Sequence, residues 1–241
     1  MNKDLIPIGQ AAEMLDISID TLRRWSESGR FPSVRKTPTG NRYFSKKAIE
    51  IYLNNLLTLA TEWISSGGEL PSHFYCPNSA VFQTRLQRMQ DELIKILNPE
   101  IQKIVPLVVA VAGEIGNNSF DHNLGNWPDI PGIFFGYDLN KRQIVLADRG
   151  QGILKTLKQV RPSLIDDKKA LEVAFTEIIT GRAPEERGNG LKFVKAVVIK
   201  SLIGLSFQSG SAQLKLERDN EDMHIEDAQK YYRGCIAFIT F

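Results

Sequence analysis

Apolar positions in the first quarter of the chain recur at helical spacing and are separated by short polar turns. The spacing predicts one helix over residues 6–15 and a second over residues 19–27. Ser18 can cap the second helix, because its hydroxyl can accept a hydrogen bond from a first-turn amide. Residues 29–44 surround a Pro-Thr-Gly-Asn sequence and predict two short strands joined by a turn. A longer helix is expected over residues 48–64.

Basic side chains gather on the second helix and on the turn between the strands. Helical spacing points the polar residues of the second helix outward, and these are Thr21, Arg23, Arg24 and Glu27. In the major groove an arginine can pair with guanine and a threonine can touch a thymine methyl group. The hairpin adds Arg35, Lys36, Arg42 and Tyr43, whose cations can neutralise phosphates. This pattern is typical of a winged helix–turn–helix, so double-stranded DNA is the expected partner.

The sequence TLRRWSESGRFPSVRKTPTGNRYF closely resembles the MerR and excisionase-like DNA-binding domains. The resemblance implies a small winged helix–turn–helix domain with a trailing helix over residues 1–64. MerR regulators usually continue into a long dimerising coiled coil, whereas this helix runs into a Ser-Ser-Gly-Gly linker over residues 65–79. The trailing helix could pair two chains as a homodimer or pack on its own domain, and the sequence leaves both open.

From residue 80 onward the pattern alternates between helical and strand spacing. The expected helices cover residues 80–97, 105–122, 168–179 and 191–200. The expected strands cover residues 132–138, 143–148, 202–209, 212–217 and 234–241. The charged stretch 218–233 is expected to be a surface excursion. Helices on one face of a mixed sheet make a two-layer α/β sandwich, so the expected fold class is α+β.

The helix expected over residues 105–122 carries a polar stripe. Residues four apart are neighbours on one helix face, which brings Glu114, Asn118 and His122 together. The opposite side keeps apolar residues for packing, namely Val108, Val111 and Ile115. An acid, an amide and an imidazole against an apolar background form a candidate site.

Two glycine motifs follow the polar stripe. Asp148-Arg-Gly150-Gln-Gly152 ends a short strand, and Arg187-Gly188-Asn189-Gly190 opens a helix. The polar stretch 180–188 before that helix is expected to be a mobile lid. In this order the three motifs resemble the GHKL ATPase superfamily, which has the Bergerat ATP-binding fold. The resemblance covers roughly residues 80–241.

The resemblance implies a role for each matched position. Asn118 is expected to hold Mg²⁺ against the phosphates of ATP, since an amide oxygen suits a hard cation. Glu114 is expected to be the general base that deprotonates water in hydrolytic members. Asp148 is expected to accept a hydrogen bond from the adenine amino group. The other matched positions are Gly150 and Gly152 beside the base and ribose, and Gly188 and Gly190 at the phosphates. Lys192 is added to this cofactor-binding set for its charge, and Arg182 and Arg187 could add charge there, although none of these cations belongs to a matched motif.

Two features bear on the type of relative. Many relatives open the last strand with Gly-Thr and place the threonine near adenine, whereas this chain has Gly234-Cys235. The candidate phosphoacceptor His73 lies in a proline-flanked linker, so a kinase that phosphorylates its own histidine is not expected. His122 fits a packed or capping histidine as well as a catalytic one.

Composition and charge limit the setting. Hydrophobic residues make up 42% of the chain, yet no apolar run reaches the roughly 18–20 residues of a membrane span. A cytoplasmic protein with no membrane partner is expected, with Cys76 and Cys235 reduced. Residues 1–47 hold nine lysines and arginines against five acidic residues. This basic excess suggests that only the N-terminal part meets nucleic acid.

The leading hypothesis is a DNA-binding transcriptional regulator whose GHKL part binds Mg-ATP and hydrolyses it slowly. The nucleotide state would then set the affinity for DNA. The alternative is a serine kinase or protein-binding switch similar to the anti-sigma kinases, acting on a small partner protein. A third hypothesis is a DNA-binding protein whose C-terminal part serves only to dimerise.

Overall fold

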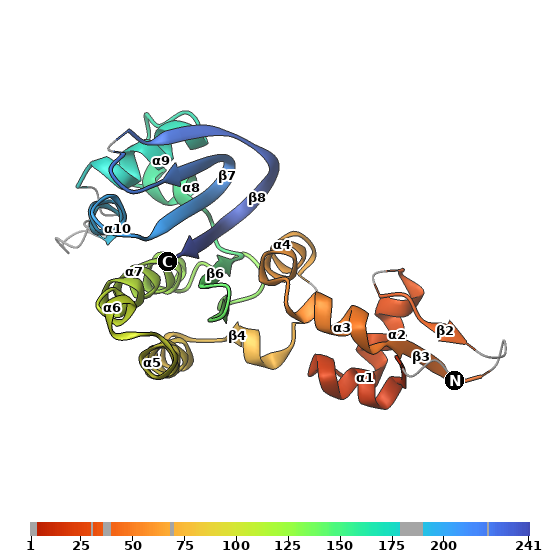
Figure 1. The fold of residues 1–241 in the computed structure, drawn as a ribbon. Helices are drawn as coiled ribbons and strands as arrows, with labels where there is room; N and C mark the ends of the chain where they lie inside the picture. The colour runs from red at the N-terminus through yellow and green to blue at the C-terminus, as the bar shows by residue number, and fades with distance from the viewer. Residues whose placement is uncertain (1–3, 30, 36–39, 68–69, 179–189, 221) are drawn as a thin grey trace. The chain divides into compact units, whose positions relative to one another are not determined.

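The computed structural model describes residues 4–29, 31–35, 40–67, 70–178, 190–220 and 222–241. The chain divides into two compact units, Met1–Tyr75 and Cys76–Phe241, and their elements are labelled in Figure 1. The fold class is α+β, as predicted. Lys36, Arg182, Arg187, Gly188 and the expected lid over 180–188 lie outside the described residues.

The N-terminal unit consists of short helices and a three-stranded antiparallel sheet in the order β1-β3-β2. Its helices are α1 (Ile8–Leu15), α2 (Ile19–Glu27), α3 (Lys46–Leu53) and α4 (Leu56–Ser66). Its strands are β1 (Leu5–Pro7), β2 (Val34–Arg35) and β3 (Arg42–Ser45). The predicted helix–turn–helix and the paired wing strands are therefore confirmed. The turn at residues 36–39 lies outside the described residues.

The core of this unit is formed by the residues that helical spacing placed inward. Its buried members include Ala11, Ala12, Leu15, Leu22, Trp25, Phe31 and Phe44. Aromatic rings join α3 to α2 and to the segment before β2, because Tyr52 lies edge-on to both Trp25 and Phe31 at centroid distances of 6.0 and 5.4 Å. The geometry of the exposed face of α2 thus depends on a closely packed interior.

Two local predictions for this unit are wrong. Residues 5–7 form strand β1 at the edge of the sheet, and the first helix begins only at Ile8. The single helix expected over residues 48–64 is two helices, α3 and α4, separated at Asn54 and Asn55. The side chain of Asn55 accepts a hydrogen bond from the Thr58 amide at 3.2 Å. Apolar spacing continues through this break, but asparagine favours a helix cap over a helix interior.

The C-terminal unit packs helices against a five-stranded sheet in the order β4-β5-β6-β8-β7 (Figure 1). A short 3₁₀ helix (Ser72–Phe74) precedes β4 (Tyr75–Cys76). The other strands are β5 (Ile133–Asp138), β6 (Gln143–Asp148), β7 (Gly204–Leu216) and β8 (His224–Thr240). The helices are α5 (Ser79–Ile96), α6 (Pro99–Gln102), α7 (Val105–Asn123), α8 (Ile153–Lys158), α9 (Asp167–Thr176) and α10 (Gly190–Ile199).

Alternate strand residues share one core with the helices. The strands contribute Ile133, Phe135, Ile144, Leu146, Leu205, Phe207, Ala237 and Ile239. The helices contribute Phe82, Leu86, Met89, Leu93, Val108, Val111, Ile115, Leu171, Phe175, Val194 and Val198. Helices α5, α7, α9 and α10 therefore cover one face of the sheet, as predicted. No helix in the described part of the chain is long and apolar enough to cross a membrane.

Two predictions for the sheet are wrong. The charged stretch 218–233 is mostly part of β8, which pairs with β7 from Lys215↔His224 onward through a bulge near Gly210. The charged residues indicated that this stretch is exposed, but they did not indicate that it pairs with β7. Lys215 and Glu226 form an ion pair across the two strands at 2.8 Å. The expected mixed sheet is also not found among β5–β6, β6–β8 and β7–β8, because all three pairs are antiparallel.

Candidate functional site

The start of α2 positions the first candidate surface, which faces DNA in a helix–turn–helix. The Ser18 hydroxyl accepts a hydrogen bond from the Thr21 amide at 3.0 Å, so the predicted cap is confirmed. The expectation that Thr21 faces outward is wrong, because its side chain is buried and lies 2.7 Å from the Ser18 hydroxyl. Thr21 Oγ1 also accepts a bond from Arg24. Thr21 therefore stabilises the first turn and orients its neighbour.

The cations of this surface differ in how they are held. Arg23, Arg24 and Arg35 are exposed, and Arg23 pairs with Asp20 one turn earlier on α2 at 2.7 Å. Arg42 is mostly covered, with 12% of its side chain exposed, and it bonds Glu27 on α2 at 2.6 Å. Arg42 thus ties strand β3 to helix α2. Tyr43 is partly buried beside it on β3. The DNA contacts of these residues stay predictions.

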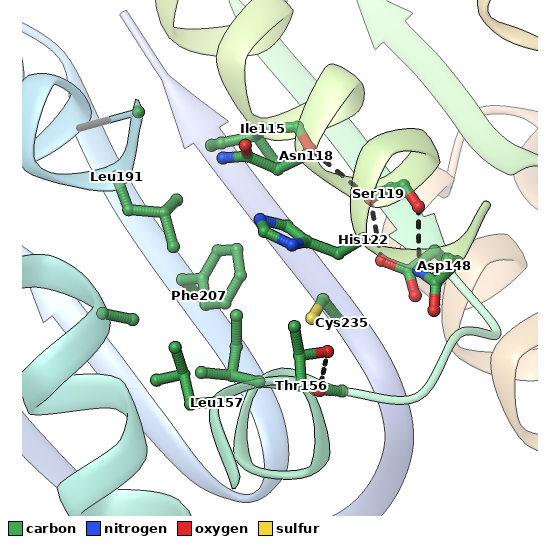
Figure 2. A pocket seen from close by; sticks show the side chains of 15 residues that line it. Ile115, Asn118, Ser119, His122, Asp148, Thr156, Leu157, Leu191, Phe207 and Cys235 are labelled. Atoms are coloured by element: carbon green, nitrogen blue, oxygen red, sulfur yellow. Dashed lines mark hydrogen bonds between the residues drawn. The ribbon is translucent and has the colours of Figure 1, made fainter. Parts of the chain in front are cut away.

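A pocket in the C-terminal unit forms the second candidate site (Figure 2). Its walls come from α7, from the loop after β6, from helices α8, α9 and α10, and from strands β7 and β8. Apolar side chains line much of it, including Ile115, Ile153, Leu157, Leu191 and Phe207. The polar groups of the lining include three predicted residues, Asn118, His122 and Asp148, together with Ser119, Asn123 and Thr156. An apolar hollow with a few convergent polar groups is the usual form of a small-molecule site.

Asp148 lies at the wall of this pocket and is 2% exposed. Its carboxylate accepts hydrogen bonds from the Ser119 hydroxyl and from the Gly150 amide, both at 2.8 Å. Burial raises the pKa of Asp148 above its ordinary value, and these hydrogen bonds oppose the rise without cancelling it. A carboxylate held by fixed donors in an apolar hollow can select a ligand by hydrogen bonding.

The polar stripe of α7 meets the start of α10 where Asn118 and Gly190 line the pocket. A side-chain carbon built on Gly190 would lie 2.6 Å from Glu114 Oε2 and 3.1 Å from Asn118 Nδ2. The backbone at the first turn of α10 therefore lies directly against the acid and the amide. Asn118 and His122 both project from α7 into the pocket in Figure 2. The structure thus brings Gly190 next to Glu114 and Asn118, and the roles expected for these residues stay predictions.

The Asp-x-Gly-x-Gly loop is held by residues that sequence reasoning missed. Asn123 on α7 accepts a hydrogen bond from the Gln151 amide at 2.8 Å and donates one to the Ser119 carbonyl at 2.8 Å. A side chain on Gly150 would overlap the Asn123 amide. Ser119 and Asn123 follow Asn118 and His122 by one position, so the same four-residue spacing could have found them.

Gly152 closes the loop where the chain enters α8. Its φ is +77°, a conformation that favours glycine, and a side chain would meet the Arg233 carbonyl and lie 3.1 Å from Ser209 Oγ. Ser209 accepts a hydrogen bond from the Ile153 amide at 2.9 Å. Ser209 lies on β7, more than fifty residues away in sequence, so no local pattern indicated it.

Gly234 and Cys235 complete the wall beside Asp148. A side chain on Gly234 would collide with the Asp148 carbonyl, so the two strands approach closely there. Cys235 lines the pocket, and its thiol lies 3.6 Å from Ser209 Oγ. Burial first, and then the neighbouring Asp148 charge, raise the pKa of the Cys235 thiol well above its ordinary value. Burial therefore favours the neutral form of the Cys235 thiol, and both Cys76 and Cys235 are free cysteines.

The donor set limits what the pocket can hold. No group of three or more His, Cys, Asp or Glu side chains placed to hold a metal ion occurs among the described residues. Asn118 and Glu114 could share a cation with oxygens supplied by a ligand. Mg²⁺ is usually held in this manner, by one or two protein groups together with phosphates and water. Lys192, in the first turn of α10, is partly exposed and does not line the pocket.

Comparison with known proteins concerns the N-terminal unit. Residues 7–44 match the family model described as MerR family regulatory protein. No curated protein matches the chain. The match covers α1, α2 and the wing strands up to Phe44. It supports a MerR-type DNA-binding domain at the N-terminus and a function as a DNA-binding transcriptional regulator.

Proposed function

We propose that the C-terminal unit of this DNA-binding regulator binds Mg-ATP and that the nucleotide state sets its affinity for DNA. One observation carries the proposal. The first turn of α10 lies against Glu114 and Asn118 at one end of a pocket that also contains the buried Asp148. The motifs that supply these residues resemble those of GHKL ATPases in the same order. A helix N-terminus favours phosphate because its unpaired amides point outward.

The chemistry of the pocket residues supports a nucleotide as the ligand. Asp148 would accept a hydrogen bond from the adenine amino group, with Ser119 and Gly150 holding its carboxylate in place. The apolar walls, such as Ile153 and Phe207, would exclude water from the base. Because Gly190 has no side chain, the phosphates could approach the first backbone amides of α10 closely.

The acid and the amide of α7 would divide the remaining work. Asn118 would bind Mg²⁺ through its amide oxygen, and the cation when bound would neutralise phosphate charge. Glu114 would orient a water molecule and accept its proton on a carboxylate oxygen. His122 projects into the same pocket, where it would fill space beside Phe207.

The proposal is tested by calorimetric unfolding of the full chain with and without Mg-ATP, alongside Asn118→Ala. A ligand at 100 times its dissociation constant stabilises the folded state by about 2.7 kcal/mol. For a unit of this size each kcal/mol raises the midpoint by about 2–4 °C, so a rise of about 5–10 °C is expected. The rise should be lost in Asn118→Ala. An unchanged wild-type midpoint at millimolar Mg-ATP would refute the nucleotide site.

Glu114→Ala separates binding from chemistry. This variant should keep the rise in midpoint and lose phosphate release, whereas retained release would remove Glu114 as the base. DNA binding is then measured on a duplex selected from a random-sequence pool, with and without Mg-ATP. Equal affinity under the two conditions would leave nucleotide binding intact but refute its control of DNA binding.

A further inference from the structure

A second pocket lies beside the proposed nucleotide pocket, on the other side of Gly152. It occupies about 600 Å³ between the first turns of α8 and the bulge where β7 and β8 bend. This volume is within the range of small-molecule sites and exceeds what one water molecule needs. Gly152 lines both pockets. Apart from this glycine, the two sets of lining residues have no member in common.

An unpaired buried amide marks this second pocket. Gln151 is 8% exposed, and its side-chain nitrogen has no hydrogen-bond partner. Gln151 is one of the residues that line this second pocket, and its backbone amide is bonded to Asn123. Buried polar groups in folded proteins almost always have a partner, and an orphan needs an explanation. A ligand oxygen that accepts a hydrogen bond from the Gln151 side-chain nitrogen would explain why this nitrogen has no partner within the protein.

The charges around the pocket define the ligand. Lys155 and Lys158 lie three residues apart on α8, where helical geometry makes them neighbours, and both are exposed. Among the described residues, neither lysine has a carboxylate within ion-pair distance. Arg233 adds a third cation, which bonds Asp129 at 2.7 Å. The opposing carboxylate in the lining is Asp167, whose Oδ2 already accepts two bonds from Ser211.

We propose that this pocket binds a small anion through its carboxylate or phosphate oxygens. Lys155 and Lys158 would neutralise the anion, and the Gln151 amide would donate to one of its oxygens. Charge-assisted hydrogen bonds of this kind are among the strongest in proteins. The site is distinct from the proposed nucleotide pocket and does not depend on it. Gly152 lines both pockets, so an anion bound in the second pocket would lie next to the loop that follows Asp148.

The test uses the full chain and two probes, inorganic phosphate and succinate, titrated calorimetrically at constant ionic strength. We expect saturable binding of at least one probe, and the probe that binds identifies the class. Lys155→Gln with Lys158→Gln should weaken that binding at least about tenfold. The matched control is Lys95→Gln with Lys103→Gln, which removes the same charge from exposed positions on α5 and beside α6. No saturable binding of either probe, or equal loss in both double variants, would overturn the proposal.

Gln151→Met distinguishes a ligand contact from a structural role. It removes the orphan donor while keeping the length of the side chain, so the midpoint of unfolding without anion should stay the same or rise. Binding of the probe should weaken about threefold or more. Asn118→Ala should leave probe binding unchanged, which separates this site from the nucleotide pocket. Unaltered probe binding in Gln151→Met would remove the buried amide from the site and overturn the assignment.

Discussion

Replacing Gly116 by alanine should destabilise the C-terminal unit, although alanine is the better helix former. Gly116 is buried in the middle of α7. A side-chain carbon built there would lie 2.9 Å from Phe82 Cε2 and closer still to two other atoms of the ring. Phe82 is fully buried, and it lies edge-on to Phe135 at a centroid distance of 5.2 Å. The ring therefore has no free space into which it can move.

Gly113 provides a matched comparison one turn earlier on the same helix. A side-chain carbon there would lie 3.3 Å from Leu86 Cδ2, the end of a side chain that can adjust. Both substitutions gain about 1 kcal/mol from helix propensity. At Gly116 this gain is opposed by overpacking against Phe82, which costs about 1–3 kcal/mol. Gly113→Ala should therefore be neutral or stabilising, and Gly116→Ala should be less stable than Gly113→Ala by about 1–3 kcal/mol.

The assay is differential scanning calorimetry of the two variants and the wild type. At about 2–4 °C per kcal/mol, the midpoint of the C-terminal unit should be about 2–12 °C lower in Gly116→Ala than in Gly113→Ala. Adding Phe82→Leu to Gly116→Ala should restore part of the loss, because the two positions are in contact and their effects are not additive. Equal midpoints for the two alanine variants would refute the reasoning that the Phe82 ring requires a glycine at this point of α7.

Two further predictions concern the carboxylate of the pocket and the DNA surface. Asp148→Asn keeps an oxygen for the Gly150 amide and supplies a donor to Ser119, so it should fold. Because burial raises the folded-state pKa of Asp148 above 3.8, the ionised carboxylate costs stability that the protonated form keeps. The wild type should therefore lose stability as the pH rises from about 4 through the raised pKa, whereas Asp148→Asn should not. The difference in free energy of unfolding, variant minus wild type, should increase over this pH range. A difference that stays constant with pH in urea unfolding would contradict this. Arg35→Ala should weaken binding to all DNA sequences about equally and lower the slope of affinity against salt by about one, measured against Lys103→Ala as a control; an unchanged slope would exclude a phosphate contact.

Local sequence determined much of the fold. The spacing of Leu22 and Trp25 gave the inward side of α2, and the Ser18 cap needed only a hydroxyl before a helix. The stripe of Glu114 and Asn118 followed from the fixed geometry of one helix. These predictions hold because each depends on contacts within a few residues of the chain.

Predictions failed where a partner distant in the sequence decides the outcome. The charged ribbon of β7 and β8 resembles a surface loop until the two strands are paired. Thr21 is a polar residue on the outward side by spacing, yet the turn before α2 folds over it. Nothing in the pattern around Ser209 indicated its place beside Cys235 and Gly152.

The candidate site shows the same division. The sequence by itself determined which chemistries are present: an acid and an amide on α7, an aspartate with glycines after β6, and a glycine at the start of α10. Only the tertiary structure decided that Gly190 lies on Glu114 and Asn118, and that Asn123 holds the loop after Asp148. Helical spacing sets positions along one element, whereas packing between elements depends on side-chain shape summed over the whole core. For that reason the motifs could be found before the fold was known, and the pocket could not.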